Sequence, residues 1–497
     1  MRGWRLQSSL IHLRTKALSW QEQTRFLAIQ KDAGFKEQKE AEVEEKGQVC
    51  ETWTWGKGED GQLGIGKEDT ERLPSLIESL QLPVLSNFTR SPMPGVLRYP
   101  ESALLKDPAS WTASSSSSSS SHEEKSGDGF MGIRTAMRYL STDVHANIPR
   151  EVHSNEVGIA CGLFHSCLWE NGNLWVWGKG DGGRLGLGGE DSMYSPVLNP
   201  NIAGVKMVAL GGLHSAAVTE DGSVYTWGFG GFGALGLGTF ERVLEPKQVE
   251  LLSLDMQKMV HIAAGGAHTA AVSESGDIFT WGRDAGEGRL GHVPSPEYEE
   301  GVPIPVKLKS ITEPMGAVNC GGFFTMALTL EGQLWSWGGN SNYELGRGDQ
   351  RSGWKPRPVP AVEKTHLLQV ACGGFHTAAL TEDGKVLTWG HGRHGQLGHG
   401  DLNSAKVPTL VKALERHRVV FVACGSSWSA AVTESGNLFT WGKNRDCQLG
   451  IPGLLDTEML PVPVVLYPDI HQNPKLPRHA VAVACGANHG MGLINRH

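Results

Sequence analysis

Long apolar runs, closely spaced cysteines and an excess of positive charge are all missing from this chain of 497 residues. Because no run of about 18 apolar residues occurs, we expect no membrane-spanning helix. The eight cysteines include no Cys-x-x-Cys pair and lack metal-ligand spacing. Lys and Arg number 45 against 53 Asp and Glu, a formal net charge of −8, whereas nucleic-acid binding usually needs a basic surface. The charge balance therefore does not indicate a nucleic-acid partner.

Sequence motifs of ordinary enzymes are missing as well. The chain contains no P-loop, no nucleophile elbow and no paired carboxylates in a recognisable catalytic setting. We therefore expect no enzymatic activity, no catalytic or metal-binding residue and no cofactor. The sequence does not identify binding residues.

Glycine and tryptophan are abundant. There are 65 glycines, whereas an average usage of about 7% would give about 35 in a chain of this length. The glycines follow no G-X-Y period, which excludes collagen, and seven of the 16 tryptophans precede a glycine. Many glycines with regularly placed aromatic residues indicate many short strands and tight turns.

Two markers recur along the chain. Trp-Gly occurs at seven positions, and after the first interval its spacing is 50 to 56 residues: Trp55, Trp177, Trp227, Trp281, Trp337, Trp389 and Trp441. A second marker, typified by "CGLFHS" at Cys161 and "GGFHT" at Gly373, stands upstream of every Trp-Gly except the first. Its seventh copy, "CGANHG" at Cys485, follows the last Trp-Gly. The two markers are therefore offset by one unit at the two ends of the chain.

Each unit between the markers has the pattern of a hairpin. In "HTAALTEDGKVLTWG" (residues 376–390), two strand-like runs flank Asp383-Gly384, and other units hold an X-Gly pair in the same place. Such pairs suit the positive φ angles of tight hairpin turns. A glycine-rich loop ending in Leu-Gly follows, and then a Pro-containing strand. Each unit thus predicts about four short strands and no helix.

Seven such units predict an all-β fold, a seven-bladed β-propeller. Residues 49–82 contain a Trp-Gly strand with nothing before it, and residues 480–497 contain the preceding strands without Trp-Gly. We expect these two segments to share one blade that closes the ring, with residues 156–497 forming the rest. Closure in this way removes exposed sheet edges.

The repeated residues are interpreted as structural. The Trp-Gly tryptophans are expected to fill space between blades. The marker histidine recurs in five units but is Phe324 and Trp428 in the other two, which does not suit a ligand and indicates a hydrogen-bonded structural residue. The five cysteines that precede a marker glycine occupy identical repeat positions, so we expect them to be far apart, small and buried. No carboxylate or cysteine at ligand spacing accompanies His391, His394 and His399, so a metal site is not expected there.

One stretch resembles a dinucleotide-binding fingerprint. "GKGEDGQLG" (residues 56–64) has glycines at G-x-G-x-x-G spacing, but it follows a strand without opening a helix. It recurs as "GKGDGG" at Gly178 and decays to "GRDAGE" at Gly282. Repetition with decay is typical of a turn, so we expect no nucleotide there.

These repeats resemble the regulator-of-chromosome-condensation family of seven-bladed propellers. "ACGGFHTAALTEDGKVLTWGHGRHGQLGHG" (residues 371–400) follows the family pattern almost throughout, and the resemblance covers residues 50–82 and 156–497. The resemblance implies the propeller with a shared closing blade. It does not specify a function, because members include a Ran exchange factor on chromatin, a plant UV-B photoreceptor and organellar proteins linked to RNA processing or translation.

The residues separate these alternatives in part. The photoreceptor's Gly-Trp-Arg-His-Thr motif is missing, and Trp428 stands alone in the histidine position. The wedge that the Ran exchange factor inserts has no equivalent among the evenly spaced later units, and the N-terminal tail here differs from that factor's basic nuclear-type tail. The chain therefore resembles organellar and plant members more than either of these proteins.

Residues 1–48 form a leader and polar linker. The first 20 residues include Arg2, Arg5, Arg14 and Lys16 and no acidic residue. A basic, Ser-containing, acid-free composition is typical of an organellar presequence, so we expect a mitochondrial protein. The alternative is an ordinary solvated leader on a nuclear or cytoplasmic protein.

Residues 83–155 form an insertion between the first and second blades. It contains the serine run 114–121 and equal numbers of acidic and basic residues, seven of each. Such a composition buries little apolar surface, so we expect a low-complexity, disordered segment that is not a basic nucleic-acid arm.

The favoured hypothesis is a non-enzymatic interaction scaffold that binds proteins through its loops. The resemblance and the leader imply mitochondrial RNA processing, or biogenesis of ribosomes or respiratory complexes, with organellar RNA-processing or ribosomal factors as partners. One alternative is guanine-nucleotide exchange on a Ran-like or other small GTPase. Another is a chromatin-associated regulator.

Overall fold

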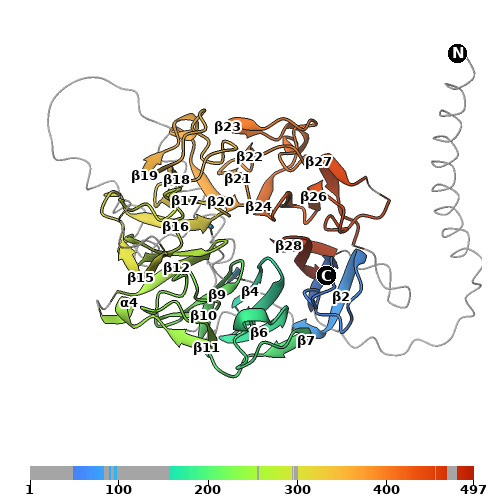
Figure 1. Ribbon diagram of the computed structural model, residues 1–497. Coiled ribbons are helices and arrows are strands. Elements are labelled where there is room, and N and C mark those ends of the chain that lie inside the picture. The colour runs from blue at the N-terminus through green and yellow to red at the C-terminus, as the bar shows by residue number, and fades with distance from the viewer. Residues whose placement is uncertain are drawn as a thin grey trace, which may run out of the picture. The chain divides into compact units, whose positions relative to one another are not determined.

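The computed structural model describes residues 49–82, 89–90, 95–97, 156–254, 257–293, 295, 300–453, 455–466 and 478–496. These residues form seven β-sheets that stand as blades around one axis (Figure 1). Six sheets have four strands and one has five. The predicted seven-bladed propeller is therefore confirmed, and it lies within Gln48–His497.

Six blades consist of consecutive antiparallel strands, and each is named here after the strand nearest the axis. Their bounds, from the innermost strand outward, are listed blade by blade. The β4 blade has β4 Glu156–Cys161, β5 His165–Glu170, β6 Asn173–Gly178 and β7 Met193–Leu198; the β8 blade has β8 Val205–Leu210, β9 His214–Thr219, β10 Val224–Gly228 and β11 Val243–Gln248; the β12 blade has β12 Met259–Ala264, β13 His268–Ser273, β14 Ile278–Gly282 and β15 Val302–Lys307. The β16 blade has β16 Met315–Cys320, β17 Phe324–Thr329, β18 Leu334–Gly338 and β19 Gly353–Pro358; the β20 blade has β20 Leu367–Cys372, β21 His376–Thr381, β22 Val386–Gly390 and β23 Ala405–Leu410; the β24 blade has β24 Val419–Cys424, β25 Trp428–Thr433, β26 Leu438–Lys443 and β27 Thr457–Pro463.

The seventh blade, the closing blade, joins the two ends of the propeller as predicted. Its order is β2 (Glu71–Leu82), β1 (Val49–Gly56), β29 (His489–Arg496) and β28 (Arg478–Cys485). Strands β1 and β29 pair antiparallel, with Trp53 opposite Gly492 and Trp55 opposite Gly490. Figure 1 shows the blue β2 and the red β28 in the same blade, at its outer and inner edges. Residues more than 400 positions apart thus complete one sheet.

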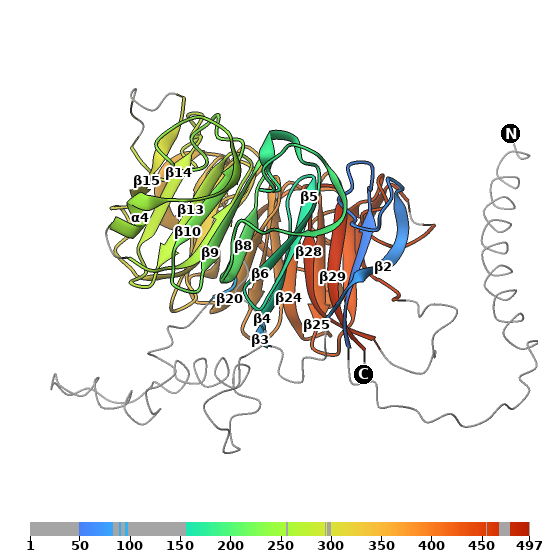
Figure 2. The same ribbon diagram turned by 90° about the horizontal axis from the view of Figure 1, so that it is seen from below.

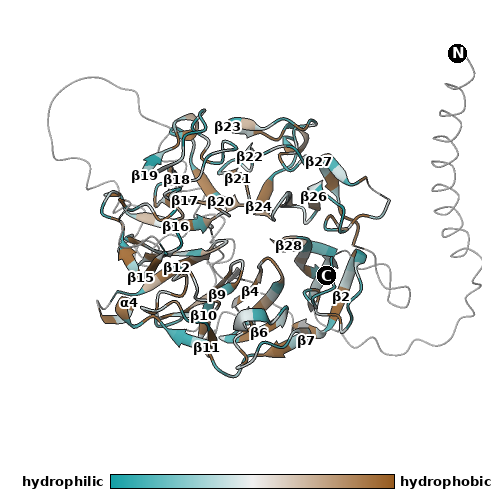
Figure 3. Ribbon diagram, in the orientation of Figure 1, coloured by the Kyte–Doolittle hydropathy of each residue, from teal (hydrophilic) through white to brown (hydrophobic). Residues whose placement is uncertain are grey.

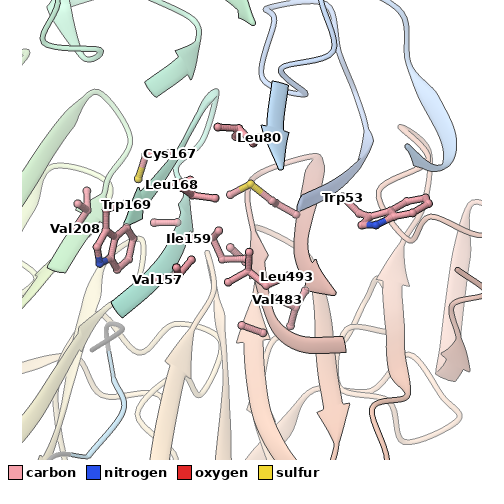
Figure 4. Packing of buried hydrophobic residues seen from close by; sticks show 14 of the residues in the cluster. Trp53, Leu80, Val157, Ile159, Cys167, Leu168, Trp169, Val208, Val483 and Leu493 are labelled. Carbon is pink, nitrogen blue, oxygen red and sulfur yellow. The ribbon is translucent and has the colours of Figure 1, made fainter. Parts of the chain in front are cut away.

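The second strand of each blade packs between neighbouring blades. In β9, β13, β17, β21 and β25 all six residues are buried, and their sequences centre on small residues such as Ala-Ala, which let sheets approach closely. Figure 3 shows hydrophobic stretches on β20 and β24 beside the axis. Figure 4 shows Val483 and Leu493 of the closing blade facing Ile159 and Leu168 of the β4 blade. The core is therefore divided into layers between blades.

Helical structure in the described ranges is limited to short pieces between blades. These are α4 (Glu250–Leu254) and the 3-10 turns η2 (Asp181–Gly183), η4 (Pro360–Val362) and η5 (Lys412–Leu414). The glycines of the predicted hairpin turns have positive φ, for example 85° at Gly222 and 80° at Gly384. No described helix is long and apolar enough to cross a membrane.

Most of the predicted insertion 83–155, and the whole leader 1–48, lie outside the described residues. Two short stretches of the insertion are described, and both bind the propeller. β3 (Thr89–Arg90) pairs in parallel with the start of β4, and Val96 forms an antiparallel bridge with Gln369 of β20. The composition of the insertion did not predict this attachment. The few apolar residues around Val96 carry little weight in a segment whose composition is dominated by the serine run and charged residues.

Candidate functional site

The seven marker loops converge at one end of the propeller axis and surround a concavity of about 500 Å³, called the mouth here. Each loop joins the first strand of its blade to the second, as between β20 and β21. Figure 2 shows the strands running side by side along the axis, so that equivalent loops lie at the same end. A sequence marker repeated every 50 to 56 residues is thereby gathered into one surface.

Hydrogen bonds between neighbouring blades hold the marker loops in place. The Nε2 atom of each marker histidine lies 2.8 to 3.0 Å from a Ser or Thr hydroxyl of the next blade, and that Ser or Thr is the second residue of the blade's second strand. The pairs are His165 with Ser215, His214 with Thr269, His268 with Thr325, His376 with Ser429 and His489 with Ser166. Each hydroxyl in turn donates to a backbone carbonyl, as Ser215 does to Arg184 at 2.8 Å. With its own proton donated to the carbonyl, the hydroxyl accepts from Nε2–H of the histidine.

Burial makes these histidines resist protonation. It lowers the pKa of His214 to about 4 and that of His376 and His489 to about 3, and it lowers the pKa of His165 and His268 well below the ordinary value. The first marker glycine packs on the ring: a Cβ at Gly373 would stand 2.4 Å from Cε1 of His376. The arrangement agrees with the structural role predicted for these histidines.

The Trp-Gly tryptophans connect neighbouring blades as well. All seven are fully buried. In six of them the indole Nε1–H donates to the carbonyl of the residue that precedes Leu-Gly in the neighbouring blade, for example Trp227 to Arg184 at 2.9 Å and Trp55 to Gln448 at 2.8 Å. Nε1 of Trp337 has no hydrogen-bond partner within the described ranges. The expected filling of the space between blades is thus accompanied by a hydrogen bond.

Phe324 and Trp428, which replace the marker histidine in two blades, are also fully buried. Phe324 offers no hydrogen bond, and Thr377 in the following blade keeps only a 3.4 Å bond to the carbonyl of Glu344. Nε1 of Trp428 donates to the carbonyl of Gly486 at 3.0 Å. Both positions retain packing and lose the histidine–hydroxyl bond.

The side of the mouth formed by the β8 to β20 blades carries aromatic and cationic side chains. Phe323 and Phe375 are 38% and 40% exposed, and their rings stack with centroids 5.5 Å apart. The guanidinium carbon of Arg283 lies 4.4 Å from the ring centroid of Phe232, and that of Arg289 lies 4.7 Å from the ring of Phe323. Both distances are typical of cation–π contacts. The marker places Phe323 and Phe375 at equivalent positions, but the sequence did not reveal the whole group, because Phe232, Arg283 and Arg289 belong to other loops.

Below the mouth, the axial channel narrows to a chamber of about 130 Å³. The expectation that the marker cysteines lie far apart is wrong, because the inner strands share one axis and bring equivalent positions together. All five cysteines line this chamber: Cys161, Cys320, Cys372, Cys424 and Cys485. They are free thiols, and burial raises the pKa of Cys161 and Cys424 to about 12. Sγ of Cys320 donates to the carbonyl of Ala263 at 3.7 Å, which gives the thiol a structural partner.

The histidines of the 390–400 loop have separate partners. Nδ1 of His391 lies 3.0 Å from Nε2 of Gln396, whereas Nε2 of His399 lies 2.9 Å from the hydroxyl of Thr388. Across the described ranges, no group of three or more His, Cys, Asp or Glu side chains is placed to hold a metal ion. The loop 56–64 forms turns after β1, with positive φ at Gly61 and Gly64, and opens no helix.

Comparison with protein families matches most of the propeller. A model of the RCC1-like domain matches residues 251–492, and a model of the regulator of chromosome condensation (RCC1) repeat matches residues 51–86, 171–218 and 221–272.

Individual relatives extend this match. The mitochondrial RCC1 domain-containing protein RUG3 of Arabidopsis thaliana is 42% identical over 452 residues, 90% of this chain and 89% of that protein. The ultraviolet-B receptor UVR8 of the same plant is 35% identical over 60% of this chain and 68% of its own length. The similarity to an organellar plant member is thus the more extensive of the two, as expected.

Solved structures share the fold at lower identity. Yeast RCC1 (Prp20) bound to Kap60 superposes with a TM-score of 0.67 at 18% identity, covering 94% of this chain and 96% of that one. Human WBSCR16 superposes with a TM-score of 0.61 at 21% identity, covering 89% and 98%.

Proposed function

Because the chain belongs to the family of RCC1 repeat proteins, we propose that it is a non-enzymatic interaction scaffold of mitochondria. The observation that carries the proposal is similarity over 90% of the chain to a relative named as mitochondrial. The presequence-like composition of residues 1–20 supports the same location. The scaffold serves organellar RNA processing, or biogenesis of ribosomes or respiratory complexes.

The geometry of the ring supports a scaffold rather than a catalyst. The repeated histidines, hydroxyls and tryptophans are committed to hydrogen bonds between blades, so they hold loops and are not available to a substrate. The marker cysteines line the interior of the channel with raised pKa values. The exposed residues at the mouth are aromatic and cationic, which suits recognition of a partner surface.

Location is tested by fusing residues 1–48 to a fluorescent protein. We expect import into mitochondria, and we expect import to fail when Arg2, Arg5, Arg14 and Lys16 are changed to Gln, because presequences need positive charge. A wild-type fusion that remains in the cytosol or enters the nucleus would contradict the mitochondrial proposal.

Partners are tested by proximity labelling with the full-length protein in cells. We expect enrichment of mitochondrial RNA-processing, ribosomal or assembly factors over a matrix-targeted control. The exchange-factor alternative is tested by stopped-flow release of a fluorescent guanine nucleotide from a panel of small GTPases. Accelerated release by the full-length protein would replace the scaffold proposal with that alternative.

A further inference from the structure

The mouth carries charge of one sign. Among the side chains that line it, Arg283 and Arg289 are the charged ones; the others are glycine, small, aliphatic, phenylalanine, serine or cysteine residues. The whole protein is acidic, with a net charge of −8. Because Arg289 is paired with Glu287, the exposed positive charge at the mouth is that of Arg283, which is complementary to an anionic group on a partner.

Both arginines are held in position before any partner arrives. The exposed Arg283 is anchored on the ring of Phe232. Arg289 is only 2% exposed; its guanidinium donates to the carbonyl of Gly322 at 3.2 Å and to Oε2 of Glu287 at 3.2 Å. Its Nε has no hydrogen-bond partner in the described part of the chain. Pre-positioned donors lower the entropy lost on binding.

Apolar surface adjoins the two cations. The stacked rings of Phe323 and Phe375 are more than a third exposed, and Phe323 also contacts Arg289. A concavity of about 500 Å³ is within the range of about 300–1,000 Å³ that ligand pockets occupy. This volume suits a few residues of an extended segment or a loop tip, and it is too small for a folded domain.

The surroundings favour a peptide over a nucleic acid. Single-stranded nucleic acid is bound along an extended basic groove, because every nucleotide carries a phosphate. Among the described residues, two cations line the mouth, and the carboxylates of Asp284 and Glu287 belong to the same loop as both. Because Glu287 already pairs with Arg289, such a site can neutralise one carboxylate of a partner but would repel a polyanion.

We infer that the mouth binds a short acidic peptide segment of a partner protein. Its carboxylate contacts the exposed Arg283, and an adjacent apolar side chain packs on Phe323 and Phe375, whose position Arg289 supports through its contact with the Phe323 ring. The inference rests on the proposed scaffold function and names the surface and the chemistry of the partner.

The test begins with a library of random dodecapeptides displayed on phage and selected on the immobilised full-length protein. We expect selected peptides to be enriched in Asp or Glu next to apolar residues. A selected peptide, labelled with fluorescein, is then titrated with wild-type protein and with variants. R283E should weaken binding about tenfold or more, because attraction becomes repulsion, and F375S should weaken it by removing the apolar contact.

Matched controls come from the same molecule. R393E makes the same charge change at an exposed arginine in the corresponding loop of the β20 blade, and F240S removes a phenylalanine of similar exposure (37%); neither residue lines the mouth. Both controls should change affinity less than about twofold. Circular dichroism melting of every variant shows that it is folded.

Three results would overturn the inference. The first is selection of neutral or basic peptides, or equal effects of R283E and R393E. The second is tighter, Arg283-dependent binding of a 12-nucleotide oligouridine, which would assign the mouth to nucleic acid. The third is a dimer in analytical ultracentrifugation that R283E dissociates, which would assign it to a second copy of the chain.

The inference and the scaffold proposal fail separately. If the R283E variant labels the same mitochondrial partners in cells as the wild-type protein does, the scaffold proposal is supported and the mouth is not the docking site for those partners. If peptides bind the mouth as expected but the full-length protein labels no mitochondrial partner, the site stands and the proposed function falls.

Discussion

One backbone carbonyl in each of several blades receives two donors from the next blade. In the β4 blade it is the carbonyl of Arg184, which accepts from the indole of Trp227 and from the hydroxyl of Ser215. A carbonyl oxygen has two lone pairs and can accept both bonds. Because the bond uses the backbone, the side chain before Leu-Gly is free to vary: Gln62, Arg184, Ala234, Arg289, Glu344, Gln396 and Gln448. The donors Trp and Ser or Thr recur, whereas the acceptor is Gln at three positions and Arg, Ala or Glu at the others.

Tryptophan replacement separates this hydrogen bond from packing. Trp227→Phe loses both ring volume and the bond to Arg184, whereas Trp337→Phe loses volume alone, because Nε1 of Trp337 has no partner among the described residues. Both tryptophans are fully buried. We expect Trp227→Phe to lower the free energy of unfolding by about 1 kcal/mol more than Trp337→Phe does. Urea denaturation of both variants measures the difference, and equal losses would contradict the role of the bond.

The marker histidines predict a pH dependence of stability. Their folded pKa values lie below the value of about 6.5 expected in the unfolded chain. Below pH 6.5 the unfolded chain binds protons that the folded chain does not, so stability is complete above that pH and is lost as pH falls. Each such histidine contributes up to about 1.4 kcal/mol per pH unit.

Urea midpoints measured from pH 8 to pH 4 test this dependence. We expect a constant midpoint above about pH 7 and a steady fall below about pH 6. His376→Phe, which copies the residue found naturally at Phe324, should make the fall shallower by removing one titrating group. A midpoint that stays level down to pH 4 would show that these histidines are not buried in the neutral form.

At the scale of elements, the innermost strands of a propeller leave one edge facing the channel. Part of the edge of β20 is occupied by the insertion. The Val370 amide donates to the carbonyl of Gly95 at 3.0 Å, and the Leu97 amide donates to the carbonyl of Leu368 at 2.9 Å. Leu97 is 9% exposed and packs with the cluster around Phe324. The insertion is therefore anchored to blades other than the one it enters.

Gly95 is the residue on which this anchor depends. Its φ is +81°, and a Cβ there would stand 1.9 Å from the carbonyl oxygen of Val370. Gly95→Ala should detach residues 95–97 and speed amide hydrogen exchange at Val370, whose partner is the Gly95 carbonyl. Gly189→Ala is the control, since no atom lies within 4 Å of its Cβ position. Unchanged exchange at Val370 in Gly95→Ala would contradict the anchor.

For the whole molecule, stability depends on joining the two ends of the chain. Across the closing blade, Nε of Arg478 on β28 lies 3.1 Å from Oε2 of Glu51 on β1, and both side chains are at most 5% exposed. The indole of Trp53 donates to the same Glu51 oxygen at 3.0 Å, and the guanidinium of Arg478 lies over that ring. A buried ion pair between residues 427 positions apart thus connects the two ends of the propeller.

Removing one member of this ion pair should lower the free energy of unfolding substantially. Glu51→Ala leaves the Arg478 charge buried without its carboxylate, and we expect a loss of about 3–5 kcal/mol of unfolding free energy. Glu190→Ala breaks the exposed pair with Arg242, whose side chains are 41% and 63% exposed, and should cost at most about 1 kcal/mol. Urea denaturation compares the two. Similar small losses of unfolding free energy would show that the Glu51–Arg478 ion pair does not stabilise closure of the ring.

The propeller was predictable because its signals are local and repeated. Trp-Gly, the marker and the X-Gly turn each depend on a few neighbouring residues, and the end-to-end offset of the markers predicted the pairing of β1 with β29. The candidate site was less predictable. Phe323 and Phe375 occupy the same position of two marker loops, but Arg283 belongs to a different kind of loop, and the meeting of the three depends on how the blades are arranged around the axis.

Local patterns in the sequence were enough to define the number of blades, the turns, the closing blade and the structural role of the repeated tryptophans and histidines, because each follows from local conformation and a regular period. Which residues meet at the axis depends instead on the folded ring. The ring gathers five equivalent cysteines into one chamber, places two arginines and two phenylalanines at one mouth, and attaches Gly95 to β20. The physical reason is the rotational arrangement of the blades. A ring brings equivalent positions of distant repeats together around its axis, and the spacing of residues along the chain does not give the distance between them in space.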